Sequence, residues 1–159
     1  MPRLFLDCDG VLADFDGYAT ALLGAPPREF EARHGARRFW ARIAGHENFF
    51  DRLPLMPDAR ELWGAVAHLG PVILTGLPRG GWAAPQKLRW AARHFPDARV
   101  ITTMARAKRE HLEAPGDVLV DDLPKYRSLW EGAGGVFVHH RNVGSTLGEL
   151  EALGLDVRR

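Results

Sequence analysis

Two aspartates one residue apart, Asp7 and Asp9, follow the short apolar run 4–6 and precede Gly10. In an extended chain, residues i and i+2 point to the same side, so both carboxylates can approach one small anionic group. A glycine permits the sharp turn that keeps such acids at the mouth of a sheet. One carboxylate can attack phosphorus and form an acyl phosphate, while the other protonates the leaving oxygen. The pattern therefore predicts phosphoryl transfer, and the alternative is an aspartate-rich turn at the end of a strand.

Two further apolar runs end in polar residues that suit the same chemistry. One is followed by Asp121 and Asp122, and the other by Thr75 and Gly76. Carboxylates are ligands for Mg2+, while a hydroxyl and a backbone amide can bind phosphate. Because the carboxyl ends of parallel strands lie along one edge of an open sheet, we expect all three strand ends to form one site.

These segments, together with Lys108, resemble the four motifs of the haloacid dehalogenase (HAD) superfamily of aspartate-nucleophile phosphohydrolases. The resemblance spans most of the chain, and its motifs are residues 7–11, residues 74–76, Lys108 and residues 121–122. Within that superfamily the chain is most similar to the 5'(3')-deoxyribonucleotidases and their bacterial relatives, through residues 9–15, 48–50, 53–57 and 118–122. Leu123 departs from that subfamily, which often carries an arginine after the acidic pair, so the resemblance leaves the substrate open.

The resemblance implies a magnesium-dependent phosphomonoesterase that works through an aspartyl phosphate. Asp7 would attack phosphorus, and Asp9 would protonate the leaving oxygen and then activate water. It also implies that Mg2+ is held by Asp7, by the backbone carbonyl of Asp9, and by the pair Asp121 and Asp122. Which member of that pair ligates the ion directly, and which acts through water, is left open.

The phosphate group would be bound by the hydroxyl of Thr75, by the amide of Gly76 and by a lysine. Lys108 lies on the segment before the acidic strand, as the family pattern requires. Lys87 is the alternative, but it lies on a regular amphipathic helix, where we expect a surface position. We therefore predict that Lys108 is the catalytic lysine.

Apolar strands and amphipathic helices alternate along the chain. Strands are expected at residues 3–8, 72–75, 100–102, 118–121 and 136–138. Helices are expected at residues 15–23, 58–70 and 84–95, around Lys108, from Pro124, and from Ser145 or Thr146. We expect Leu88 on the buried face of its helix, and Asp58 with Glu61 forms a capping-box-like start. The alternation predicts an α/β fold, a Rossmann-like parallel sheet with helices on both faces.

The segment that follows the first strand is too long for one crossover helix. We expect residues 15–56 to form a small helical cap inserted after that strand, with residues 1–14 and 57–159 forming the HAD-like core. In the superfamily such a cap closes over the phosphate site and selects the substrate. Its aromatic residues include Trp40 and Phe49, and a ring facing the cleft would suit stacking on a nucleobase. The alternative for any single ring is a place in the core of the cap.

The composition fits one globular enzyme of 159 residues, with 46% hydrophobic residues and a formal net charge of +1. That charge gives no general drive toward nucleic acid or an anionic membrane. Cys8 is the only cysteine, so no internal disulfide can form and a reducing compartment is expected. The chain begins almost at once with a strand and has no apolar run long enough to span a bilayer, so we expect a cytoplasmic protein without a membrane partner. The oligomeric state, a homodimer included, is left open.

The sequence thus favours a phosphomonoesterase that acts on a small phosphorylated substrate, with a (deoxy)nucleoside monophosphate as the first choice, which is the activity of a 5'-nucleotidase. The alternatives keep the chemistry and change the substrate to a sugar phosphate, another small metabolite or a polynucleotide end. A further hypothesis is a catalytically silent binding protein of the same fold. The presence of Asp9 argues against it, because loss of the acid/base residue is the easiest route to silence.

Overall fold

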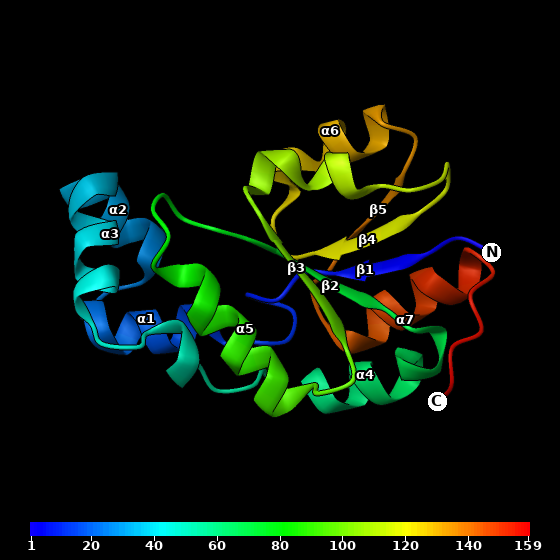
Figure 1. Cartoon of the computed structure of the whole chain (residues 1–159), viewed down its shortest axis with the longest axis horizontal. Coiled ribbons are helices and arrows are strands. Elements are labelled where there is room, and N and C mark those ends of the chain that lie inside the picture. Colours follow the sequence, from blue (N-terminus) through cyan, green and yellow to red (C-terminus); the bar gives the residue numbers. More distant parts are fainter.

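Five parallel strands form one sheet in the computed structural model, which describes residues 1–159 (Figure 1). The strand order is β3-β2-β1-β4-β5, so the first strand lies at the centre. The strands are β1 (Leu4–Leu6), β2 (Val72–Gly76), β3 (Arg99–Thr103), β4 (Val118–Asp121) and β5 (Val136–His139). Strands β1 and β4 are wholly buried, as expected for a parallel sheet that is covered on both faces.

Helices cover both faces of this sheet (Figure 1). One face carries α4 (Ala59–Val66), with the 3-10 turn η2 (Ala67–Leu69) after it, α5 (Ala83–His94) and α7 (Val143–Ala152). The other face carries η3 (Ala105–His111), η4 (Pro124–Tyr126) and α6 (Arg127–Gly132). None of the helices combines the length and the apolar character that crossing a membrane requires. The architecture confirms the predicted α/β fold with a Rossmann-like parallel sheet.

Side chains alternate between the two faces along β1. Leu4 and Leu6 belong to the large buried cluster on one side of the sheet, whereas Phe5 belongs to a smaller cluster on the other. There the ring of Phe5 packs edge-on against Trp130 of α6, with the centroids 5.4 Å apart. The indole N–H of Trp130 donates to the carbonyl of Asp117 at 3.1 Å, so this large ring is buried with its polar group satisfied.

The chain between β1 and α4 forms three helices and a short turn beyond the carboxyl ends of the strands (Figure 1). These elements, which we call the cap, are α1 (Phe15–Leu23), α2 (Pro27–His34), α3 (Ala36–Gly45) and η1 (Phe50–Arg52). The chain leaves the core and returns to it at neighbouring points, because Ala13 and Leu55 form an antiparallel bridge. Beside that bridge, the amide of Asp14 donates to the carbonyl of Pro54 at 2.8 Å.

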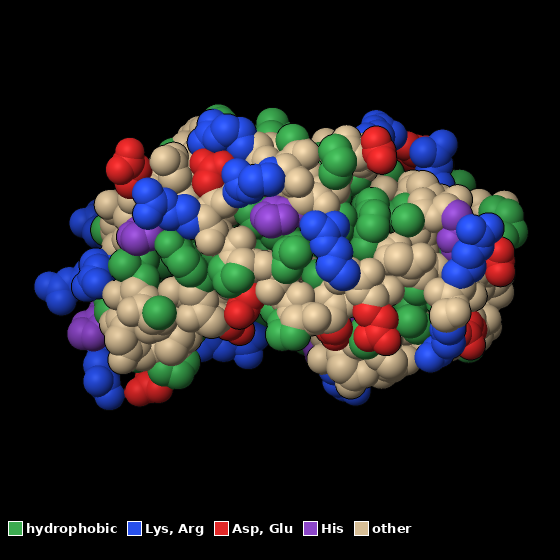
Figure 2. Space-filling model, turned by 90° about the horizontal axis from the view of Figure 1, so that it is seen from below, with side chains coloured by type: hydrophobic (Ala, Val, Ile, Leu, Met, Phe, Trp, Pro, Cys, Tyr) green, Lys and Arg blue, Asp and Glu red, His purple; other side chains and the backbone are tan.

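Charged side chains are unevenly spread over the surface. On the face seen in Figure 2, acidic and basic side chains are interspersed over the core, while basic side chains are prominent at the end formed by the cap. Helix α3 contains no acidic residue. The exposed arginines of α2 and α3 are Arg28, Arg33, Arg37, Arg38 and Arg42. This end of the molecule is therefore more basic than the net charge of +1 would indicate.

The buried face of helix α5 differs in part from the one that the sequence suggested. We expected Leu88 to point inward, but it is 45% exposed. The buried residues of α5 are Ala83, Lys87, Trp90 and Ala91. A lysine within this row interrupts the apolar periodicity on which the prediction depended.

Two helix starts differ in detail from the prediction. Asp58 is the N-cap residue of α4, as expected, but its side chain makes no capping hydrogen bond, and its Oδ2 accepts from the amide of Val143 at 3.0 Å instead. Helix α7 begins at Val143 instead of Ser145 or Thr146. Its N-cap is Asn142, whose side chain accepts from the amide of Ser145 at 2.8 Å.

The side chain of Asp117 fixes the opposite edge of the sheet, where the strands begin. It is fully buried, and its carboxylate accepts from the amides of Arg3 and Glu113, each at 2.9 Å, and of Ala114 at 3.0 Å. Burial alone would raise the pKa of Asp117, but these N–H groups and the charge of Arg3 lower it. A lowered pKa means that the ionised carboxylate stabilises the fold, and this contribution is lost as pH falls through the pKa of the folded protein.

We predict that Asp117→Asn lowers the free energy of unfolding by about 2–4 kcal/mol near neutral pH, because an amide N–H would then face N–H donors. Urea denaturation followed by circular dichroism measures the loss. The loss should be complete above about pH 4 and shrink below it, where the wild-type carboxylate itself becomes protonated. Asp97→Asn, which neutralises an exposed carboxylate, is the matched control. Equal stability of Asp117→Asn and the wild type at neutral pH would contradict the prediction.

Candidate active site

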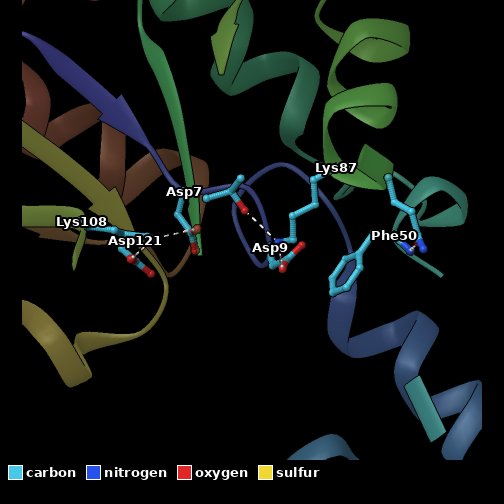
Figure 3. A network of polar contacts seen from close by, with 8 residues as sticks. Asp7, Asp9, Phe50, Lys87, Lys108 and Asp121 are labelled. Carbon is cyan, nitrogen blue, oxygen red and sulfur yellow. Dashed lines mark hydrogen bonds and ion pairs between the residues drawn. The ribbon is translucent and has the colours of Figure 1, made fainter. Parts of the chain in front are cut away.

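Three strand ends meet at the carboxyl edge of the sheet. Asp7 follows β1, Thr75 lies near the end of β2, and Asp121 is the last residue of β4. Because β1 lies between β2 and β4, the strand order brings the three side chains to one place. Figure 3 shows Asp7 and Asp9 between two lysines that approach from opposite sides.

Lys108 joins two of the carboxylates. Its ammonium donates to Asp7 Oδ1 at 2.9 Å and to Asp121 Oδ2 at 3.0 Å, and all three residues are buried. The lysine comes from η3 and is separated from Asp7 by 101 positions in the sequence, so the fold brings the two side chains together. Burial opposes its charge, but the two carboxylates outweigh that effect and raise the pKa of Lys108. The lysine therefore stays charged beside Asp7.

Asp7, Asp121 and Asp122 form a cluster of carboxylates. One oxygen from each lies within 4.8 Å of the others. Burial raises the pKa of Asp7, and the charge of Asp121 raises it further, while Lys108 opposes both effects. Burial and the charge of Asp7 raise the pKa of Asp122 as well. Such crowding of buried acids is unfavourable unless a cation offsets it.

This cluster has the donor set that a magnesium ion requires. Mg2+ prefers oxygen ligands and is usually bound through one or two carboxylates, with water and substrate phosphate completing the shell. Asp122 Oδ1 is buried without a hydrogen-bond partner. Asp121, in contrast, accepts from Lys108 and, through Oδ1, from the amide of Leu123 at 3.0 Å. The residues present therefore fit the predicted ion, and Asp122 is the member of the pair with a free oxygen.

The turn after Asp9 requires a glycine. Gly10 has a φ of +81°, which L-residues with a side chain rarely adopt. A Cβ at this position would lie 2.0 Å from Oδ2 of Asp122. The turn is closed by the amides of Val11 and Leu12, which donate to the carbonyl of Cys8 at 3.2 and 2.8 Å. The missing side chain at residue 10 thus lets the first motif lie against the acidic pair.

Lys87 is the second lysine of the site, and the prediction of a surface position for it is wrong. It is 3% exposed, and its ammonium donates to Asp9 Oδ2 and to Thr75 Oγ1, both at 2.8 Å. The other oxygen of Asp9, Oδ1, is buried without a hydrogen-bond partner. Burial raises the pKa of Asp9, and although Lys87 lowers it, the net shift is upward. Each of the two aspartates of the first motif thus has its own lysine.

Two further residues shape this edge of the sheet. Gly76 ends β2 against η3, where a Cβ would lie 3.1 Å from the Cβ of Ala105. His139 ends β5, and its Nε2 donates to the backbone carbonyl of Asp122 at 3.0 Å. The sequence did not indicate this contact, which fixes the main chain at a candidate metal ligand.

The two cap residues predicted to contact a substrate differ in exposure. Phe49 has no exposed surface, and its ring packs edge-on against Phe15 and Phe50 at 5.6 and 5.1 Å. The prediction is therefore wrong for Phe49, which is a core residue of the cap. Trp40 is half-buried and packs edge-on against Phe39, with the ring centroids 4.9 Å apart. Trp40 keeps part of its surface exposed and stays a candidate.

No family model matches the sequence, and no curated protein matches it. Among solved structures, the chain is similar to a hydrolase from Streptococcus pneumoniae TIGR4, with 14% sequence identity and a TM-score of 0.57. The two chains share one fold. The likeness covers 96% of this chain and 98% of that chain, so the shared fold includes both the sheet and the cap region.

We predict that Mg2+ stabilises the folded protein, because three crowded carboxylates gain a counter-charge. The stabilisation should strengthen as pH rises, since acids with raised pKa values must lose their protons before they bind the ion. Differential scanning fluorimetry over a series of MgCl2 concentrations and pH values measures the shift in Tm.

Asp122→Asn supplies the matched test of the ligand set. Without metal its Tm should rise at pH values above the pKa of Asp122, which is raised to about 9, because one buried charge is removed there. Each kcal/mol gained corresponds to about 2–4 °C in a protein of this size. Most of the shift caused by Mg2+ should disappear. Asp97→Asn should leave both quantities unchanged, and an equal magnesium shift in Asp122→Asn and the wild type would exclude Asp122 as a ligand.

Proposed function

We propose that this protein is a phosphomonoester hydrolase of the HAD type that forms a phosphoaspartate at Asp7. One observation carries the proposal: at the carboxyl end of the central strand, Asp7 and Asp9 are each bonded to a separate buried lysine. The solved hydrolase that shares the fold supports the broader class of hydrolase. The order of the four motifs along the sequence supports the narrower class of phosphohydrolase.

In the first step, a carboxylate oxygen of Asp7 bonds to phosphorus as the bond between phosphorus and the ester oxygen breaks. Asp9 donates its proton to that oxygen, so the alcohol leaves neutral. The upward shift in the pKa of Asp9 favours the protonated form that this step needs. Lys108, Thr75 and the amide of Gly76 would offset charge on the phosphoryl oxygens.

In the second step, Asp9 is a carboxylate and takes a proton from a water molecule as the water oxygen attacks phosphorus. The bond between phosphorus and Asp7 breaks, and inorganic phosphate leaves. Asp7 returns as a carboxylate and Asp9 as an acid, so one water is consumed for each ester. The cap lies beyond this edge of the sheet, where exclusion of bulk water would protect the acyl phosphate.

A bound Mg2+ would reduce the repulsion between the carboxylate nucleophile and the anionic ester. Asp7 and Asp122 would hold it directly, because Asp122 Oδ1 has no other partner. Asp121 would act through water, because Lys108 and the amide of Leu123 already occupy its oxygens.

The proposed substrate is a (deoxy)nucleoside monophosphate, which would make the protein a 5'-nucleotidase. Support comes from the similarity of residues 9–15 and 118–122 to the 5'(3')-deoxyribonucleotidases, and from the half-buried ring of Trp40. The burial of Phe49 removes one of the two rings expected to contact a base. A polynucleotide end is a second candidate, because the exposed arginines of α2 and α3 offer charge for further phosphates.

A phosphate-release screen tests the proposal. It covers nucleoside monophosphates, sugar phosphates and 5'-phosphorylated oligonucleotides, with and without Mg2+. We predict magnesium-dependent release with a preference for nucleoside monophosphates. Asp7→Asn should lower kcat by more than about a thousandfold without lowering the Tm, because an amide oxygen cannot replace the nucleophile.

The outcomes of the screen separate the alternatives. Broad release without a preference for nucleotides would indicate a phosphatase for other metabolites, and a preference for oligonucleotides would support the second candidate. Substantial turnover by Asp7→Asn would rule out the covalent mechanism. If no ester releases phosphate, the remaining hypothesis is a catalytically silent binding protein of this fold.

We predict that Trp40→Ala raises KM for a nucleoside monophosphate about tenfold, which matches roughly 1–3 kcal/mol of lost base stacking. Steady-state kinetics should show kcat/KM for p-nitrophenyl phosphate nearly constant, because that ester has no base. Phe49→Ala is the contrasting variant, since loss of a fully buried ring should lower the Tm and both activities together. If Trp40→Ala behaves in the same way, Trp40 belongs to the core of the cap.

A further inference from the structure

Lys87 is held by three groups in the site (Figure 3). Its Nζ donates to Asp9 Oδ2 and to Thr75 Oγ1, both at 2.8 Å, and lies 4.5 Å from the centroid of the Phe50 ring. An ammonium carries three N–H donors, and these two oxygens accept from two of them. The face of an aromatic ring attracts a cation, most strongly where water is excluded. The three contacts therefore fix the position of a buried charge.

The ring of Phe50 is itself fixed to the helix that carries the lysine. Phe50 begins η1, the last element of the cap, whereas Lys87 lies on α5 of the core. The neighbour of Lys87 on α5, Gln86, accepts a hydrogen bond from the amide of Phe50 through Oε1 at 2.9 Å. The backbone and the ring of Phe50 thus both contact α5.

Further side chains of α5 bind the same segment of the cap. Arg89 pairs with the carboxylate of Asp51, with Nη2 and Oδ2 2.6 Å apart. The indole N–H of Trp90 donates to the carbonyl of Leu53 at 2.8 Å and is buried. Because these α5 residues are three or four positions from Gln86, they lie on one face of the helix. The end of the cap and α5 therefore form one unit, with Phe50 against Lys87.

Lys87 acts on a substrate only through the groups that it holds. It is 3% exposed, and the ring of Phe50 lies against its ammonium. The bond to Asp9 fixes the direction of that carboxylate. The bond to Thr75 uses a lone pair of Oγ1, so the hydroxyl proton remains available for a phosphoryl oxygen.

We propose that Lys87 is a positioning residue that aims Asp9 at the leaving oxygen, and that the ring of Phe50 holds Lys87 in place. This rests on the phosphomonoesterase activity proposed above. It makes the last element of the cap part of the apparatus that protonates the leaving group. The role is distinct from that of Lys108, which bonds to the nucleophile.

The test compares two leaving groups that differ in whether they must be protonated. An alkoxide requires a proton to leave, whereas p-nitrophenolate leaves without one. The value of kcat/KM reports the steps up to formation of the phosphoaspartate. The ratio of kcat/KM for the most active alkyl ester of the phosphate-release screen to that for p-nitrophenyl phosphate therefore measures how well Asp9 acts as an acid.

Lys87→Met keeps the apolar stem of the side chain and removes the ammonium. We expect it to lower kcat/KM for the alkyl ester about a hundredfold and for p-nitrophenyl phosphate less than about threefold. Phe50→Leu should change the ratio in the same direction by about tenfold. Phe30→Leu is the matched control, because it removes another buried ring of the cap, one that packs against His34, and it should leave the ratio unchanged.

An unchanged ratio in Lys87→Met would overturn the proposal, and so would an equal loss on both esters, which would place Lys87 in phosphate binding or in folding alone. If a variant does not fold, pentafluorophenylalanine at position 50 keeps the shape of the ring and inverts its quadrupole, and an unchanged ratio there would refute the role of Phe50. A wild-type protein that is inactive on every ester would refute the phosphomonoesterase instead. The two failures are therefore distinguishable.

Discussion

Burial of like charge at one edge of the sheet is the constraint on which the rest of the site depends. Four carboxylates and two ammonium groups come together there. If all are ionised, the balance of four negative and two positive charges is −2, which one divalent cation would neutralise. The groups are Asp7, Asp9, Asp121, Asp122, Lys87 and Lys108. An anionic ester could bind here only with such compensation in place.

The two lysines give the two aspartates of the first motif different surroundings. Lys108 is shared between Asp7 and a second carboxylate, so its charge is divided between two acids. Lys87 is shared between Asp9 and the neutral hydroxyl of Thr75. If one aspartate is to act as a nucleophile and the other as a proton donor, their surroundings must differ. Two aspartates in identical surroundings would have the same pKa.

The strand ends were predictable because each is marked locally, by an apolar run that stops at a polar residue. Their convergence follows from the rule that parallel strands end at one edge, so Asp7, Thr75 and Asp121 could be brought together without knowledge of the structure. The position of Lys108 came from the family pattern alone. Nothing local in the sequence placed it beside Asp7.

Burial of individual side chains was the part that could not be predicted. Lys87 occupies a core-facing position of α5. The only feature of the sequence that indicated its burial was its spacing from Ala83 and Trp90, and a search for apolar periodicity does not count a charged residue. Phe49 was expected in a cleft, yet in an aromatic-rich cap the rings that form the core and the rings that face a ligand have the same residue types. Asp58 fits a capping pattern and is the N-cap residue of α4, but its carboxylate bonds to the amide of Val143 in α7 and makes no capping hydrogen bond.

The bridge between Ala13 and Leu55 makes the cap an insert whose two ends are side by side. A different insert could be grafted between such ends without disturbing the register of the sheet, which is a route by which one chemical centre could serve many substrates. The contacts between α5 and the end of the cap limit which residues such a graft could replace. Phe50 lies on the cap side of the bridge but contacts Lys87, so a graft that replaced residues 15–49 would retain the ring beneath the ammonium. A graft that extended to residue 54 would exchange the whole cap and also remove the Phe50 ring from Lys87.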